Sequence, residues 1–90
     1  MAIPSPKEQK LFEGGNPRQF RAFKNVAIRK LTQLDAAQTL GFLRSPPGNR
    51  FEALKGNRRG QYSIRINDQY RICFVWSENG PKDVEIVDYH

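Results

Sequence analysis

The spacing of apolar residues changes at Phe51, and this change limits the folds open to the chain more than any other feature. Before that point, apolar residues recur every three or four positions, at Phe20, Phe23, Ala27, Leu31 and Leu34. Beyond it, apolar and polar residues alternate, as in the run Tyr62-Ser63-Ile64-Arg65-Ile66. A period near 3.6 indicates an amphipathic helix, whereas a period of two indicates a half-buried strand. The sequence therefore predicts an α+β protein in which helices come first and an antiparallel sheet follows.

The first half of the chain contains the signals for two N-terminal helices. A short helix is expected over residues 7–13, ended by Gly14-Gly15. The second begins at Asn16-Pro17, with asparagine as N-cap and proline at the first helical position. The short connection predicts that the two helices are antiparallel. Residues 35–43 are expected to add a helical turn, and residues 44–50, with Pro46, Pro47 and Gly48, a stiff turn.

Three strands are expected after residue 60, separated by turns at Asn67-Asp68 and at Glu78-Asn79-Gly80-Pro81. One face of this meander is strongly apolar and should cover the helices: Tyr62, Ile64, Ile66, Tyr70, Ile72, Phe74, Trp76, Val84 and Ile86. The other face is half polar and is expected to be open to solvent or to a ligand: Ser63, Arg65, Arg71, Cys73 and Glu85, with Tyr89 as a further candidate. Residues 1–6, with Pro4 and Pro6, can form at most a short edge strand.

Composition narrows the class of protein. The 90 residues suffice for one domain, 1–90, with a shallow core. No apolar run approaches the roughly 18 residues of a transmembrane helix, and the N-terminus lacks the apolar stretch of a secretory signal. Cys73 is the only cysteine, which excludes an internal disulfide framework and a cysteine-based zinc site. A cytoplasmic protein with no cofactor and no metal is expected.

The net charge of +6 is unevenly distributed. Residues 1–60 contain 12 lysines and arginines against 4 acidic residues, and residues 61–90 contain 3 against 5. This concentration of positive charge predicts a polyanionic partner such as a nucleic acid, with an acidic protein as the main alternative. Part of this positive charge lies on the second expected helix, where the basic residues form either a solvated face or a face that binds a partner: Arg18, Arg21, Lys24, Arg29 and Lys30.

Two groups of residues could carry chemistry. The loop Lys55–Gly60 is basic and bracketed by glycines, and alternation places Arg65 and Arg71 on one sheet face, a combination suited to phosphate. The chain ends in Asp88-Tyr89-His90, and the Asp88 carboxylate and the terminal carboxylate would favour the protonated imidazole, a general acid. Cleavage of RNA by its own 2′-hydroxyl needs a base, cations on the phosphate and an acid for the leaving oxygen. These groups could supply all three.

Three runs of the sequence resemble the HigB family of bacterial toxins, within the RelE/ParE superfamily: residues 50–64, residues 67–74 and the terminal residues 88–90. The resemblance extends to Leu11-Phe12-Glu13, to residues 29–37 and to residues 45–50, so that it spans about residues 11–90. It implies a RelE-like fold with two N-terminal helices packed on one face of a small antiparallel sheet. It also implies a toxin that cleaves translated mRNA on the ribosome and so inhibits translation and growth. The implied partner is a HigA-type helix-turn-helix antitoxin, through which the complex would contact operator DNA.

The resemblance also assigns residues. Arg71 matches the strand arginine thought to hold the scissile phosphate, and Lys55 matches the lysine of a Leu-Lys-Gly motif. Asp88, Tyr89 and His90 match the C-terminal catalytic group. Glu52 stands where several members have a histidine, and a carboxylate can accept a proton but cannot supply a cation. Family members also usually begin with an apolar strand. In this chain the corresponding strand is expected to be shorter, because residues 1–6 contain Pro4 and Pro6.

The expected catalytic set is thus Glu52, Lys55, Arg71, Asp88, Tyr89 and His90, with no metal. The expected RNA-binding set is Arg50, Lys55, Arg58, Arg59 and Arg65. Glu52 or Asp88 would orient or accept the proton, His90 would donate one, and Tyr89 would stack on or position a base. Two alternatives remain, since one fold serves several functions. The first is a non-enzymatic ParE-like toxin acting on a protein such as gyrase. The second is a weakly active toxin whose main partners are its antitoxin and the operator.

Overall fold

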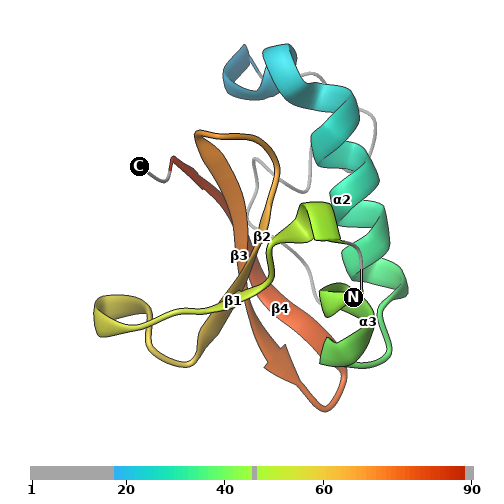
Figure 1. The fold of residues 1–90 in the computed structure, drawn as a ribbon, viewed down its shortest axis with the longest axis vertical. Helices are drawn as coiled ribbons and strands as arrows, with labels where there is room; N and C mark the ends of the chain where they lie inside the picture. Colours follow the sequence, from blue (N-terminus) through green and yellow to red (C-terminus); the bar gives the residue numbers. More distant parts are fainter. Residues whose placement is uncertain (1–17, 46, 89–90) are drawn as a thin grey trace.

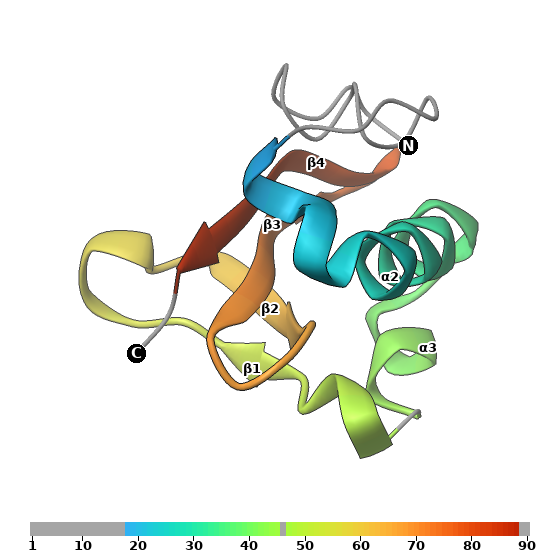
Figure 2. The ribbon, with the colours of Figure 1, turned by 90° about the horizontal axis from the view of Figure 1, so that it is seen from above.

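The computed structural model describes residues 18–45 and 47–88, which form a two-layer α+β arrangement (Figures 1 and 2). Its elements in chain order are η1 (Arg18–Phe23), α2 (Lys24–Ala36), α3 (Leu40–Arg44), η2 (Pro47–Asn49), β1 (Glu52–Ala53), η3 (Gly56–Arg58), β2 (Gln61–Arg65), β3 (Tyr70–Ser77) and β4 (Gly80–Asp88). Seen from above, α2 lies along one side of the sheet, with α3 next to it (Figure 2). The predicted order of helices and then strands is confirmed for these residues.

The helical half differs in detail from the prediction. The segment expected as one helix is a 3-10 helix up to Phe23 and an α-helix from Lys24. Phe23 interrupts it with a backbone at φ −131° and ψ 25°, and its ring packs 4.5 Å from that of Tyr70. The expected helical turn is present as α3, whose N-terminus is capped by the Thr39 hydroxyl. The expected first helix, 7–13, and the strand at residues 1–6 lie outside the described residues.

The sheet is antiparallel throughout, in the order β1-β2-β3-β4. The three predicted strands are confirmed as β2, β3 and β4, and β1 is a short edge strand that alternation did not reveal because it has two residues. The Asn67 side chain closes the β2–β3 turn by accepting bonds of 2.8 Å from the backbone N–H groups of Gln69 and Tyr70. The second turn is shorter than expected, since Gly80 and Pro81 already belong to β4.

The core lies between α2 and the predicted apolar face. Ile64, Ile72 and Ile86 form one row across three strands, and all are buried. The other members of the core cluster are Ala27, Leu31, Leu34, Ala37, Leu43, Ile66, Phe74 and Val84. An irregularity lies opposite Phe74, where β4 has an extra residue; Asp83 there has a positive φ of 52°. The extra residue shifts the alternation of β4 by one position, so that beyond the bulge Pro81 is buried and Lys82 is exposed.

The structure corrects two expectations about exposure, the first for one residue and the second in part. Lys30, expected on the polar face of its helix, is only 6% exposed, because its ammonium donates to the buried Asn49 side chain. The half-polar sheet face is not fully open either, since Ser63 and Cys73 at its centre are completely buried. The charged side chains of neighbouring strands and loops lie around Cys73, including Arg58, Glu85, Arg71 and Glu52. The face is therefore charged at its surface and closed beneath.

Candidate functional site

Arg71 is held by two hydrogen bonds on the half-polar face of the sheet. It lies in β3, directly opposite Arg65 of β2. Its Nε donates a 2.8 Å hydrogen bond to the buried Ser63 hydroxyl. Its Nη2 donates a 2.5 Å bond to the backbone carbonyl of Arg50. A guanidinium has five N–H donors in a rigid plane, so two anchored atoms fix the direction of the others.

A surface pocket of about 230 Å³ opens beside Arg71. Its lining side chains are Arg50, Arg65, Asn67, Asp68 and Arg71. Three guanidinium groups line this pocket against one carboxylate, that of Asp68, which forms an ion pair with Arg65 across the turn. Guanidinium groups bind phosphate through paired N–H donors. We call this the arginine pocket, and its composition suits a phosphate group.

A buried polar network holds the backbone on one side of the arginine pocket. The Asn49 side chain is fully buried. It accepts from Lys30 of α2 and donates to the Leu43 carbonyl at 3.1 Å and to Gln33 at 3.3 Å. The next residue, Arg50, has a positive φ of 42°. Asn49 thus connects two helices to the point where the chain turns toward β1 and presents the Arg50 carbonyl to Arg71.

Two substitutions at Arg50 separate the effect of its backbone conformation from the effect of its side chain. A left-handed conformation costs an L-residue roughly 1–2 kcal/mol, which glycine avoids. Arg50→Gly is therefore expected to be more stable to urea than Arg50→Ala by about 1 kcal/mol. Both variants lack the Arg50 guanidinium, so the difference in stability between them reports the backbone alone. Equal stability of the two variants would contradict a left-handed Arg50.

Glu52 shares the half-polar face with Arg71. It lies in β1 in register with Ser63, which is in turn in register with Cys73 of β3. Glu52 is exposed at the sheet edge, one strand from the hydroxyl that holds Arg71. The register therefore places the carboxylate on the same face as the arginine pocket, although Glu52 does not line that pocket.

The basic loop lies at the opposite end of β2 from the arginine pocket, since it precedes Gln61 whereas Arg65 ends that strand. Lys55 and Arg59 are exposed. Arg58 Nη1 bonds Gln61 at 3.1 Å and forms a 3.3 Å ion pair with Glu85. The structure thus gathers Arg50, Arg65 and Arg71 in one pocket, and it keeps the loop cations apart from them.

The C-terminal group is described only in part. Asp88 is the last residue of β4, is in register with Tyr70, and accepts a 3.1 Å hydrogen bond from the Gln69 side chain. The residue opposite Arg71 is Val87. Successive side chains of a strand point to opposite faces, so Asp88 and Arg71 do not share a face by register. Tyr89 and His90 lie outside the described residues.

Three groups escaped the sequence-based prediction of the site: the Ser63 hydroxyl, the Asn49 amide and the Arg50 carbonyl. Alternation had put Ser63 on the face of Arg71, so its proximity was available as a signal. Asn49 had no such signal, because its partner Lys30 lies 19 residues away in the chain. Among the described residues, no three His, Cys, Asp or Glu side chains gather closely enough to hold a metal ion.

Cys73 is buried beneath this face. Burial raises the pKa of its thiol, as do Glu85 and Glu52 nearby, while Arg58 and Arg71 oppose the shift. Alkylation requires the thiolate. We expect iodoacetamide to modify the native chain at pH 8 at least about tenfold more slowly than the urea-unfolded chain. The native rate should also begin to rise at a higher pH. Because this is the only cysteine, intact mass reports the reaction directly, and equal rates would contradict its burial.

Comparison with known proteins identifies the family. A model described as a RelE-like toxin of the type II toxin-antitoxin system HigB matches residues 6–90. The chain belongs to this HigB-like toxin family. Toxin HigB-1 of Vibrio cholerae serotype O1 is similar to it, with 56% identity over 55 residues, which cover 61% of this chain and 58% of that toxin. An uncharacterized protein of Haemophilus influenzae is 41% identical over 54 residues, which cover 60% of this chain and 54% of that protein. The match thus spans a little over half the length of these curated relatives.

Solved structures support the fold of this HigB-like chain. A YoeB–YefM complex from Staphylococcus aureus matches with a TM-score of 0.59 and 21% identity, over 100% of this chain and 95% of that one. A heterotetrameric YoeB–YefM toxin–antitoxin complex from the same organism matches with a TM-score of 0.65 and 23% identity, over the same shares. At these identities the likeness concerns the fold. Within the described part of the chain, no helix has the length and apolar character needed to cross a membrane.

Proposed function

We propose that this HigB-like chain is an endoribonuclease that cleaves translated mRNA on the ribosome. In the proposed reaction, the 2′-hydroxyl of one nucleotide attacks the adjacent phosphate, and the bond to the 5′-oxygen of the next nucleotide breaks. The products are a 2′,3′-cyclic phosphate and a free 5′-hydroxyl. The observation that carries the proposal is the arginine pocket, where Arg71 is fixed by Ser63 and by the Arg50 carbonyl.

The arginine pocket supports the electrostatic part of this reaction. The phosphate gains negative charge as the hydroxyl attacks, and donors already fixed in place stabilise that charge without reorganisation. Arg50, Arg65 and Arg71 would surround the phosphate from two strands and the preceding turn. Lys55 and the exposed part of the basic loop would attract the rest of the strand from the far end of β2, through charge at longer range.

Proton transfer is assigned to Glu52 and to the C-terminal residues. Glu52 is the proposed base in preference to Asp88, because it lies one strand from Ser63 on the face of Arg71, whereas Asp88 is in register with Tyr70. Asp88 would then orient the C-terminal group. His90 is proposed to protonate the leaving 5′-oxygen, since an imidazole titrates near neutral pH. Tyr89 is proposed to stack on a base.

A type II system also implies a partner. We propose that a HigA-type helix-turn-helix antitoxin neutralises this chain, and that the complex contacts operator DNA through the antitoxin. The match to YoeB–YefM structures supports a fold that occurs in toxin–antitoxin complexes. The cytoplasm, where mRNA is translated, is the proposed site of action.

The proposal is tested by expressing the chain with an antitoxin that can be removed on demand. Growth arrest with new mRNA ends is expected after removal, and His90→Gln should abolish both. Growth arrest with DNA damage and without new mRNA ends would instead indicate a ParE-like toxin with a protein target. Retained antitoxin binding without growth arrest would indicate a chain that acts mainly in the operator complex.

A further inference from the structure

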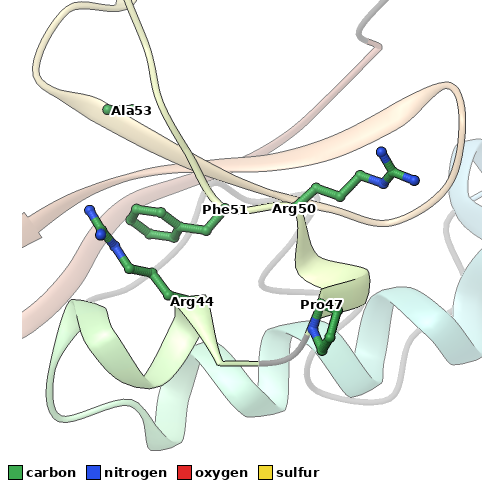
Figure 3. Close-up of a pocket in the computed structure, with 5 residues that line it drawn as sticks. All are labelled: Arg44, Pro47, Arg50, Phe51 and Ala53. Carbon is green, nitrogen blue, oxygen red and sulfur yellow. The ribbon is translucent and has the colours of Figure 1, made fainter.

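A second pocket adjoins the arginine pocket at the edge of the sheet. It has a volume of about 320 Å³ and is lined by Arg44, Pro47, Arg50, Phe51 and Ala53 (Figure 3). Arg50 lines both pockets, so the two hollows are neighbours. In Figure 3 the Arg44 side chain reaches up beside the Phe51 ring, while the Arg50 guanidinium points to the other side. We call this second hollow the Arg44–Phe51 pocket.

A column of aromatic rings fixes one wall of the Arg44–Phe51 pocket. The Phe51 ring stacks on Tyr62, with centroids 5.4 Å apart and planes 24° apart. Tyr62 in turn lies 6.2 Å from Phe74, which is fully buried in the core. The Phe51 ring is therefore held by the sheet itself. A ring held in this way gives a rigid support to the side chain that lies over it, so that side chain loses less freedom when a flat ligand stacks on it.

Arg44 supplies a planar cation beside that ring. Its guanidinium carbon lies 5.1 Å from the Phe51 centroid, within the range of a cation–π contact. Arg44 is otherwise exposed at the end of α3. Nucleobases stack on both aromatic rings and guanidinium planes. Because Tyr62 stacks on Phe51 and Arg44 lies over the same ring, the surface offered to a base is the outer face of the Arg44 guanidinium, supported by Phe51 and next to a site suited to phosphate.

We propose that the Arg44–Phe51 pocket binds the base of a nucleotide that flanks the phosphate in the arginine pocket. This inference rests on the proposed function, because it takes single-stranded RNA as the ligand. Arg50 stands between the two pockets and would contact the backbone that joins them. Proline, phenylalanine and alanine have no side-chain group that bonds a base edge, and the Arg44 guanidinium lies over Phe51, so we expect stacking to outweigh hydrogen bonds to base edges. The pocket should therefore accept any of the four bases with similar affinity.

The test uses non-cleavable 2′-O-methyl RNA hexamers, intact or with one abasic position, and measures affinity by fluorescence anisotropy. Loss of one stacked base is expected to weaken binding to the unmodified chain by about 5- to 100-fold. Arg44→Gln should weaken the intact hexamer and remove most of the effect of that abasic position. Arg44→Lys keeps the charge without the plane and should bind in between. Phe51→Leu keeps an apolar side chain without the flat face and should act like Arg44→Gln. Lys82→Gln, an equal loss of charge on β4, is the control.

Three outcomes would overturn the inference: no hexamer binding, equal effects of Arg44→Gln and Lys82→Gln, or an undiminished abasic effect in Arg44→Gln. The proposed function fails separately. If the unmodified chain shows the base-dependent binding and yet cleaves no mRNA on ribosomes, the pocket stands and the cleavage reaction falls. If mRNA is cleaved while Arg44→Gln binds as the unmodified chain does, the reaction stands and the pocket falls.

Discussion

Arg71→Ala is expected to reduce the rate of mRNA cleavage by about 10²- to 10³-fold, the usual cost of removing one fixed donor from developing charge. The loss exceeds one ionic contact, because the Arg71 guanidinium is already held by the Ser63 hydroxyl and the Arg50 carbonyl. The measurement is the single-turnover rate of mRNA cleavage on purified translating ribosomes. Circular dichroism and thermal unfolding should show that the variant is folded.

Two further variants make this prediction sharper. Arg71→Lys should recover only a small part of the rate, because one ammonium cannot bond Ser63 and the Arg50 carbonyl and still present paired donors to phosphate. Lys82→Ala removes a charge from β4 outside the arginine pocket and should cleave almost as fast as the unmodified chain. Cleavage by Arg71→Ala within threefold of the unmodified rate would remove Arg71 from the mechanism.

Asn49→Ala is expected to lower the free energy of unfolding by about 3 kcal/mol, because it leaves the Lys30 ammonium buried without its acceptor. The substitution also removes the hydrogen bonds that the Asn49 amide donates to the Leu43 carbonyl and to the Gln33 side chain. Urea unfolding measures the effect. Gln33→Ala removes a single bond of 3.3 Å at a half-buried position and should cost less than about 1 kcal/mol. A loss below 1 kcal/mol in Asn49→Ala would contradict the network.

Because the expected loss of stability in Asn49→Ala comes from the buried Lys30 charge, removing that charge should restore part of the stability. Burial lowers the pKa of Lys30, and Arg29 and Arg65 lower it further. The folded state therefore binds this proton less tightly than the unfolded state does. The contribution of Lys30 to the free energy of unfolding therefore rises as the pH increases from its pKa in the folded state to its higher pKa in the unfolded state. The cost of Asn49→Ala should accordingly shrink at alkaline pH. Lys30→Met combined with Asn49→Ala should be more stable than Asn49→Ala alone, since no charge is then buried.

The sequence predicted most where structure depends on near neighbours in the chain. Alternation placed Ile64, Ile72 and Ile86 on one face because side chains of a strand point to its two faces in turn, and the register confirms it. The same rule brought Arg65 and Arg71 together. The two-residue strand β1 is too short for any period to show.

Contacts between distant residues account for what the sequence did not predict. Helical spacing gave no reason to bury Lys30, because its acceptor enters from η2. The sequence placed Arg58 among the cations of the basic loop and gave no sign of its ion pair with Glu85, which lies 27 residues later in the chain. Arg50 joins the arginine pocket only because its carbonyl meets a strand 21 residues further along the chain. Each of these depends on tertiary packing, which local patterns do not encode.

The most direct test of the central claim maps the ends of a defined mRNA on purified translating ribosomes treated with the purified chain. We expect new ends inside the translated region, with a 5′-hydroxyl on one fragment and a 2′,3′-cyclic phosphate on the other. These ends should be absent in reactions with Arg71→Ala or without ribosomes. An intact mRNA, or fragments that carry a 5′-phosphate, would contradict attack by the 2′-hydroxyl at the arginine pocket.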